Sequence, residues 1–191
     1  MADPQTFFGT RAAGWDEKFP DDGPRYEQAV RELGVHPGDV VLDAGCGTGR
    51  ALPVLRAAAG PTGTVIGVDV TTEMLTEARA RGRGELVRGD VLRLPLADAG
   101  VDALFAAGLV SHLPDPAAGL TELARVARPG ARLALFHPVG RAALAARHGR
   151  TLEPDDVRSE PRIRAALETA GWSVTAVDDA ADRWLVLAVR R

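Results

Sequence analysis

The sequence contains one cysteine, few aromatic residues and no long uninterrupted apolar run. A lone cysteine excludes an internal disulfide, and the first residues, MADPQTFFGT, lack the basic and apolar regions of a secretory signal. Charges, glycines or prolines interrupt every apolar stretch before it reaches the ~20 residues of a membrane-spanning helix. We therefore expect a cytoplasmic protein with no membrane partner.

An excess of positive charge is also absent, because the formal net charge is -3 at pH 7. A protein of this charge has no general electrostatic attraction to nucleic acid or to an anionic membrane surface. The composition therefore favours a small-molecule ligand, and we expect no nucleic-acid partner.

What the sequence does contain is an alternation of short apolar runs with longer helical stretches, in 191 residues of which 46% are hydrophobic. This pattern predicts one α/β domain, 1–191, with helices on both faces of a sheet. The first five runs are typical of strands buried on both faces, at residues 39–44, 64–70, 85–90, 101–108 and 131–138. Two later runs, 172–179 and 183–191, are too close for a crossover helix and predict an antiparallel hairpin at one edge. Crossover helices are expected at 50–60, 71–82 and 116–130.

Three glycines, Gly45, Gly47 and Gly49, alternate in the turn between the first strand and its helix. Glycine permits positive φ and close approach of a ligand, and we expect the helix N-terminus to offer unpaired amides. The spacing G-C-G-T-G lacks one position of the dinucleotide fingerprint G-x-G-x-x-G, which opposes a nicotinamide dehydrogenase. Asp43 precedes the glycines, and Asp69, which suits a ribose diol, follows Gly49 by 20 residues. A tight turn without a ligand is the alternative.

Four motifs follow one another along the chain: VVLDAGCGTG, VIGVDVTTEML, VRGDVLRLPLADAGVDALFAAGLVSHLPD and ELARVARPGARLALFHP. Together they resemble the class I S-adenosylmethionine-dependent methyltransferases, particularly the methyltransferase 11 type, over residues ~15 to 137. The resemblance implies a Rossmann-like, doubly wound, seven-stranded mixed sheet with a C-terminal antiparallel hairpin. It also implies S-adenosylmethionine as cofactor, with S-adenosylhomocysteine as product.

The same resemblance assigns roles to residues. Asp43 and the backbone of Gly45 and Gly47 would hold the methionine amine, and Asp69 the ribose. Met74 would lie against the adenine, whose amino group would donate to Asp90. The predicted cofactor-binding residues are Trp15, Asp43, Gly45, Cys46, Gly47, Asp69, Val70, Met74, Asp90, Val91 and Ala106, with Ala106 at the methionine end and the Val91 amide on the adenine ring.

Four of these residues have ordinary structural alternatives. Asp69 and Asp90 could cap helices or stabilise turns, since aspartate is common in both places. Met74 could fill the core. Cys46 is more easily explained as a small filler than as a nucleophile.

Methyl transfer needs positioning above all, and a hydroxyl or protonated amine acceptor also needs a general base. His137 follows the fifth strand, where a ligand crevice opens, so it is the first candidate for a base, with His112 second. Packing roles are the alternative for both residues. His36 and His148 are expected on the surface.

The N-terminal residues 1–36 are predicted to form a lid or helical segment. Trp15 and Asp16 are its candidates for ligand contact, and packing of the aromatic residues on the sheet edge is the alternative. A second insertion, 139–161, contains Arg141, Arg147 and Arg150, which could meet an acidic acceptor but are better explained as a solvated face.

We therefore expect methyl transfer from S-adenosylmethionine to a small molecule, with the methylated atom (oxygen, nitrogen or carbon) left open. The segment LVSHLPD does not match the Asn/Asp-Pro-Pro-Tyr/Phe motif of enzymes that methylate amines of nucleic acids. A binding module that keeps the cofactor but transfers nothing, as a sensor or partner subunit, is the alternative. No metal site is predicted, and the late hairpin edge offers a surface for a homodimer.

Overall fold

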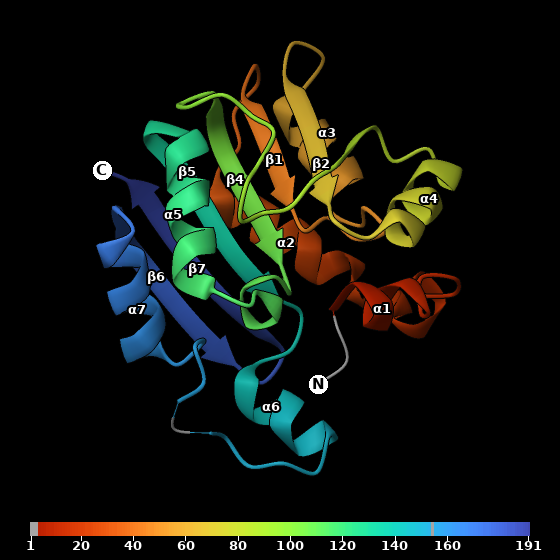
Figure 1. Cartoon of the computed structure of the whole chain (residues 1–191), viewed down its shortest axis with the longest axis vertical. Coiled ribbons are helices and arrows are strands. Elements are labelled where there is room, and N and C mark those ends of the chain that lie inside the picture. The colour runs from red at the N-terminus through yellow and green to blue at the C-terminus, as the bar shows by residue number, and fades with distance from the viewer. Residues whose placement is uncertain (1–3, 154) are drawn as a thin grey trace.

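The computed structural model describes residues 4–153 and 155–191, which form a seven-stranded sheet with helices packed on it (Figure 1). The strands lie in the order β3-β2-β1-β4-β5-β7-β6. Their bounds are β1 Val40–Ala44, β2 Thr64–Asp69, β3 Glu85–Arg88, β4 Val101–Ala107, β5 Ala127–His137, β6 Trp172–Ala180 and β7 Arg183–Arg190. The expected mixed, Rossmann-like sheet is confirmed.

The first five strands are parallel, and β7 pairs antiparallel with both β5 and β6. The parallel strands are mostly apolar because both faces of the sheet are covered. The strand order reverses at β1 and β4, which lie side by side. From β1 the chain continues to β2 on one side of this pair, and from β4 it continues to β5 on the other side. The carboxyl ends of β1 and β4 therefore form the switch point at which open α/β sheets bind ligands.

Two apolar clusters hold helices against the sheet. One joins α5 and α7 to Trp172 and Trp184, and the other joins α2 and α3 to Phe105 and Phe136. The helices are α1 Pro4–Gly9, α2 Gly23–Leu33, α3 Leu52–Ala59, α4 Thr72–Ala80, α5 Pro116–Val126, α6 Arg141–Arg147 and α7 Glu160–Thr169, with short 3-10 turns at η1 Asp16–Lys18, η2 Pro20–Asp22 and η3 Val110–His112. Within the described ranges, no helix has the length and apolar character needed to cross a membrane.

One predicted boundary is wrong. We expected the crossover helix 116–130 to continue to residue 130, but α5 ends at Val126 and β5 begins at Ala127. Pairing with β4 then jumps from Val101↔Ala127 to Ala103↔Arg132. Pro129 cannot donate to a sheet ladder and Gly130 has φ of 82°, so these residues form a bulge in the strand.

The N-terminal residues fall into two parts. The helix α2 packs on α3 and β5, as part of the layer behind the sheet in Figure 1. The residues before it run over α4 instead, where a Cβ at Gly9 would lie 3.1 Å from Oε2 of Glu73. We call residues 5–22 the N-terminal strap.

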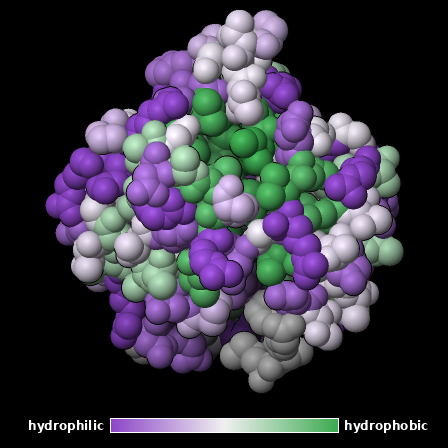
Figure 2. Space-filling view, turned by 45° about the horizontal axis from the view of Figure 1, so that its top comes forward, coloured by the Kyte–Doolittle hydropathy of each residue, from purple (hydrophilic) through white to green (hydrophobic). Residues whose placement is uncertain are grey.

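The surface mixes apolar and hydrophilic residues. Figure 2 shows apolar residues gathered near the middle of one face, with hydrophilic residues around them. Few large hydrophobic side chains are strongly exposed in the described part of the chain, and two of them, Phe7 and Phe19, belong to the strap. The strap is therefore held over the molecule with part of its aromatic surface in water.

Candidate functional site

The turn after β1 combines three left-handed glycines. The φ angles of Gly45, Gly47 and Gly49 are 68°, 55° and 78°, a region in which side chains are strained. A Cβ at Gly45 would lie 2.8 Å from Leu109, and one at Gly49 would lie 2.9 Å from Leu52. At Gly47 the nearest atom would be the Met74 sulfur at 4.0 Å. Gly45 and Gly49 are therefore required by the protein's own packing, whereas Gly47 faces open space toward Met74.

Three backbone amides of this turn are already paired. The Gly45 and Cys46 amides both donate to the Val68 carbonyl, at 2.8 and 3.0 Å. The Gly47 amide donates to Oδ2 of Asp69 at 2.8 Å. The end of β2 therefore satisfies these three donors, and they are not available to a ligand.

Asp43, at the end of β1, is the most unusual charged group at the site. Its residue is 1% exposed and its Oδ2 has no hydrogen-bond partner. Burial, with a smaller contribution from the negative charge of Asp69, raises the pKa of Asp43 to about 8. The ionised form of such a buried carboxyl is stable only when a cation or a hydrogen-bond donor pairs with it.

Asp69 shapes the backbone on both sides of it. Besides the Gly47 amide, it accepts a hydrogen bond from the Thr71 amide at 2.8 Å, just before α4 begins. Asp69 therefore stabilises the turn before α4, which is one of its structural alternatives, and both oxygens still have lone pairs for further donors.

The remaining predicted cofactor residues occupy neighbouring strand ends. Val70 follows β2, and Asp90 and Val91 follow β3, the next strand in the sheet. Asp90 is exposed and accepts from the Leu92 amide at 2.9 Å. Val91 is buried, as is Met74 on α4. Parallel strands bring these residues to one edge of the sheet.

Cys46 points away from that edge into the core. Its sulfur lies 2.9 Å from where a Cβ of Gly67 would be. Burial raises the pKa of the thiol, and the charges of Asp43 and Asp69 raise it further. The side chain is therefore a small filler, as its structural alternative predicted.

The N-terminal strap is fastened to the glycine turn by Asp16. Its Oδ1 accepts from the Thr48 hydroxyl at 2.6 Å, and its Oδ2 pairs with Arg83 at 2.5 Å. Burial favours a higher pKa for Asp16, but the hydrogen bonds from Thr48 and Arg83 outweigh it and lower the pKa. Trp15 packs edge-on against Phe8 and is tilted against Phe19. Trp15 therefore directly precedes Asp16, which binds Thr48 of the glycine turn.

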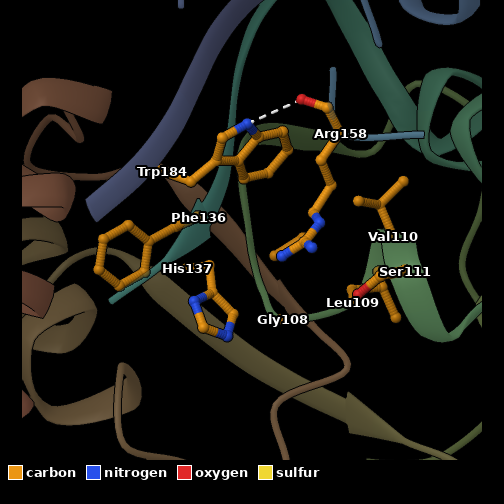
Figure 3. A pocket seen from close by; sticks show the side chains of 9 residues that line it. Gly108, Leu109, Val110, Ser111, Phe136, His137, Arg158 and Trp184 are labelled. Carbon is orange, nitrogen blue, oxygen red and sulfur yellow. Dashed lines mark hydrogen bonds between the residues drawn. The ribbon is translucent and has the colours of Figure 1, made fainter. Parts of the chain in front are cut away.

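A narrow crevice lies at the carboxyl ends of β4 and β5 (Figure 3). It is lined by Ala106, Gly108, Leu109, Val110, Ser111, Phe136, His137, Arg158 and Trp184. Of these, Ala106 and His137 were predicted site residues. Leu109 also covers Gly45, so the crevice adjoins the glycine turn.

Both candidate bases are neutral at pH 7. Burial, aided by the positive charge of Arg158, lowers the pKa of His112, and burial also lowers that of His137. The Nδ1 atom of His137 lies 2.8 Å from the Val139 carbonyl and 3.1 Å from the Val139 amide nitrogen, and the tautomer decides which of the two it bonds. Nε2 is the acceptor nitrogen in the tautomer whose Nδ1–H donates to the carbonyl. His112 lies on η3 and packs edge-on against Phe8 of the strap.

Three contributors to the site were not found from the sequence: Arg158, Trp184 and Thr48. Arg158 lies between α6 and α7, where no motif or period marks it, and α7 was itself not predicted. Pro161 just after Ser159 was the available signal for the start of that helix. Arg141, expected on a solvated face, instead pairs with Asp179 at 2.9 Å.

Comparisons with known proteins agree with this geometry. The family Methyltransf_11, described as a methyltransferase domain, matches residues 42–135. An uncharacterized 37.1 kDa protein of transposon TN4556 from Streptomyces fradiae is 41% identical over 129 residues, covering 64% of this chain and 37% of that protein. Methyltransferase GfsG of Streptomyces halstedii is 38% identical over 125 residues, covering 62% and 44%.

A solved structure of a SAM-dependent methyltransferase from Aquifex aeolicus covers nearly the whole chain. It superposes with a TM-score of 0.79 at 28% identity, covering 96% of this chain and 98% of that one. The chain spans less than half the length of the two curated relatives named above.

Proposed function

Because the chain belongs to the class I S-adenosylmethionine-dependent methyltransferases, we propose that it transfers the methyl group of this cofactor to a small-molecule acceptor. The observation that carries the proposal is the buried Asp43 carboxyl, whose Oδ2 has no partner directly before the glycine turn. A protonated amine satisfies such a group with charge and hydrogen bonds together. The methionine end of S-adenosylmethionine carries that amine.

The glycine turn supports the same ligand. Its Gly45, Cys46 and Gly47 amides are already paired, so it is poorly suited to cradle a phosphate. Carbonyl oxygens and the Asp43 carboxyl are what an ammonium group requires. The residues present therefore fit S-adenosylmethionine better than a dinucleotide.

The other end of the cofactor would lie along the ends of β2 and β3. Asp69 would accept from the ribose hydroxyls with its remaining lone pairs, and Asp90 would accept from the adenine amino group. Apolar surface for the adenine would come from Val70, Met74 and Val91. Ala106 and the strap residue Trp15 would close the methionine end.

S-adenosylmethionine supplies a methyl group on a positively charged sulfur that is already a good leaving group. The protein's work is therefore orientation and removal of a proton from the acceptor. His137 would take that proton on Nε2 in the tautomer whose Nδ1–H donates to the Val139 carbonyl. The crevice is narrow, which favours a small acceptor.

Calorimetric titration with S-adenosylmethionine and S-adenosylhomocysteine tests the cofactor site. We expect micromolar binding that Asp69→Ala and Asp43→Asn abolish or weaken by at least tenfold, because Asp69→Ala removes an acceptor and Asp43→Asn removes the negative charge that pairs with the ligand ammonium. Asp98→Ala is the matched control, since the Asp98 side chain is 80% exposed. Absence of binding to a well-folded wild-type protein would contradict the proposal.

A second assay separates an enzyme from a cofactor-binding module that transfers nothing. The protein is incubated with methyl-labelled S-adenosylmethionine and a library of small acceptors, and labelled product is measured. We expect product that depends on an acceptor from the library. Tight cofactor binding without any product would favour the non-catalytic alternative.

A further inference from the structure

One side chain of the crevice, Arg158, carries a permanent positive charge. Figure 3 shows its guanidinium reaching into the crevice, toward the space between His137 and Val110. The side chain is only 13% exposed. A charged group buried to this extent beside a ligand crevice needs a partner on its open side.

Arg158 is held in a defined orientation from behind. Its Nε and Nη2 lie 3.3 and 3.2 Å from the two carboxylate oxygens of Asp156. The Asp156 carboxylate also accepts from the Arg158 amide at 2.9 Å, and the Arg158 carbonyl accepts from the buried Trp184 indole at 3.0 Å. Backbone and side chain are both fixed, so little entropy is lost when the guanidinium binds a ligand.

The remaining N–H groups of the guanidinium are available on the crevice side. No described residue accepts a hydrogen bond from Nη1, and Asp156 occupies only the edge formed by Nε and Nη2. Nη1 together with the outer N–H of Nη2 forms a second planar edge, which matches the two oxygens of a carboxylate.

The positive charge of Arg158 reaches the open side of the crevice. It adds to burial in lowering the pKa of both His112 and His137. The same charge favours an anion beside these residues.

We propose that Arg158 binds a carboxylate of the acceptor, so that the substrates of this protein are small carboxylic acids. The inference rests on the proposed function, because it assumes that the crevice beside His137 is the acceptor site. A phosphate dianion fits less well, since Arg158 is the one permanently charged cation lining the described crevice and the two histidines are neutral. Ser111, which also lines the crevice, can donate a further hydrogen bond.

Binding is measured with acids paired to their uncharged analogues. Benzoate and hexanoate are titrated beside benzamide and hexanamide into protein saturated with S-adenosylhomocysteine, with ligand-detected NMR as the readout. We expect at least one acid to bind about tenfold to a hundredfold more tightly than its amide, as a charge-assisted hydrogen-bonded pair requires. Acid binding should also raise the histidine pKa values, measured from the ring proton shifts.

The variant Arg158→Gln should abolish the preference for the acid, and Arg158→Lys should restore part of it because the charge returns without the planar edge. Arg164→Gln is the matched control on α7, where the side chain pairs with Glu160 near the surface. Equal binding of acids and amides by the wild type, or an acid preference that survives in Arg158→Gln, would overturn the inference.

The same samples separate this failure from failure of the proposed function. S-adenosylhomocysteine binding is measured first in each variant, and we expect it to be unchanged in Arg158→Gln because Arg158 is not among the predicted cofactor residues. Normal cofactor binding without any acid preference contradicts only the role of Arg158. Loss of cofactor binding in the wild type contradicts the proposed function itself.

Discussion

At the scale of single residues, the proposed role of Asp43 would link cofactor binding to a proton. Burial, and after it the negative charge of Asp69, disfavours the ionised form of Asp43 and raises its pKa. With a pKa of about 8, the carboxyl is mostly protonated at pH 6 to 7 in the free protein. A bound ammonium group favours the ionised form, so binding should release this proton.

We therefore predict that affinity for S-adenosylhomocysteine rises with pH, by up to about tenfold per pH unit between pH 6 and 7.5, where the ligand amine is still protonated. Calorimetry in two buffers of different ionisation enthalpy measures the proton directly. Asp43→Asn should bind more weakly and release none. Heats that do not depend on the buffer would mean that Asp43 does not ionise on binding.

The same raised pKa affects the stability of the free protein. The unfolded Asp43 ionises near pH 4 while the folded one stays protonated, so this residue disfavours folding progressively from about pH 4 to pH 8. Asp43→Asn removes the effect. The variant should gain stability over the wild type as pH rises through this window, measured by urea unfolding at pH 5 and pH 8.

His137 provides a second prediction at this scale. Burial lowers its pKa below the usual value, so the proposed base is mostly neutral near pH 7. Replacement by Gln should lower kcat about 10²- to 10⁴-fold, since a general base typically contributes that much. The wild-type rate should fall only on the acid side of the ordinary histidine pKa, and His148→Gln, on the exposed end of α6, should leave kcat unchanged. Full turnover in His137→Gln would show that another group takes the proton.

At the scale of secondary-structure elements, the N-terminal strap depends on a few polar contacts. Asp16 joins the strap to Thr48 of the glycine turn and to Arg83 after α4. A segment tied to the cofactor turn in this way opens only when these bonds break. The rate at which cofactor leaves should therefore depend on Asp16.

We predict that Asp16→Ala increases the dissociation rate of S-adenosylhomocysteine about tenfold, as the loss of charge-assisted hydrogen bonds implies. Stopped-flow tryptophan fluorescence can follow it, because Trp15 lies in the strap whereas Trp172 and Trp184 are fully buried. Glu17→Ala is the control, since Glu17 is 67% exposed in its pair with Arg81. A dissociation rate equal to that of the wild type would show that the strap does not limit cofactor release.

Elements differ in how far the sequence predicts them. All seven strands were expected within a few residues, because strands buried on both faces must be apolar over most of their length. The helix α7 was missed because only Ile163 and Leu167 are buried on it, so its apolar stripe is short although their i, i+4 spacing is helical. Glycine and acid positions followed from motif spacing, but Arg158 could not, because only tertiary folding brings the segment before α7 to the ends of β4 and β5.

At the scale of the whole molecule, the C-terminal hairpin connects the core to the crevice. Its two tryptophans lie at opposite ends of the sheet: Trp184 pairs with His137 at the carboxyl end of β5, and Trp172 pairs with Arg190, beyond the other end of the β5 pairing. Both are fully buried and each indole donates to a backbone carbonyl, Trp172 to Leu120 and Trp184 to Arg158. The two residues therefore make similar contributions to folding but differ in their distance from the site.

This arrangement predicts that Trp172→Phe and Trp184→Phe each lower the free energy of unfolding by about 1 to 3 kcal/mol, because each leaves a buried carbonyl unpaired and a gap in the core. Urea unfolding followed by circular dichroism measures the loss. Only Trp184→Phe should also weaken the binding of carboxylic acids, since it releases the backbone of Arg158, while S-adenosylhomocysteine affinity stays unchanged in both. If Trp172→Phe weakened acid binding as much as Trp184→Phe, the crevice would depend on the stability of the whole sheet rather than on the local support of Arg158.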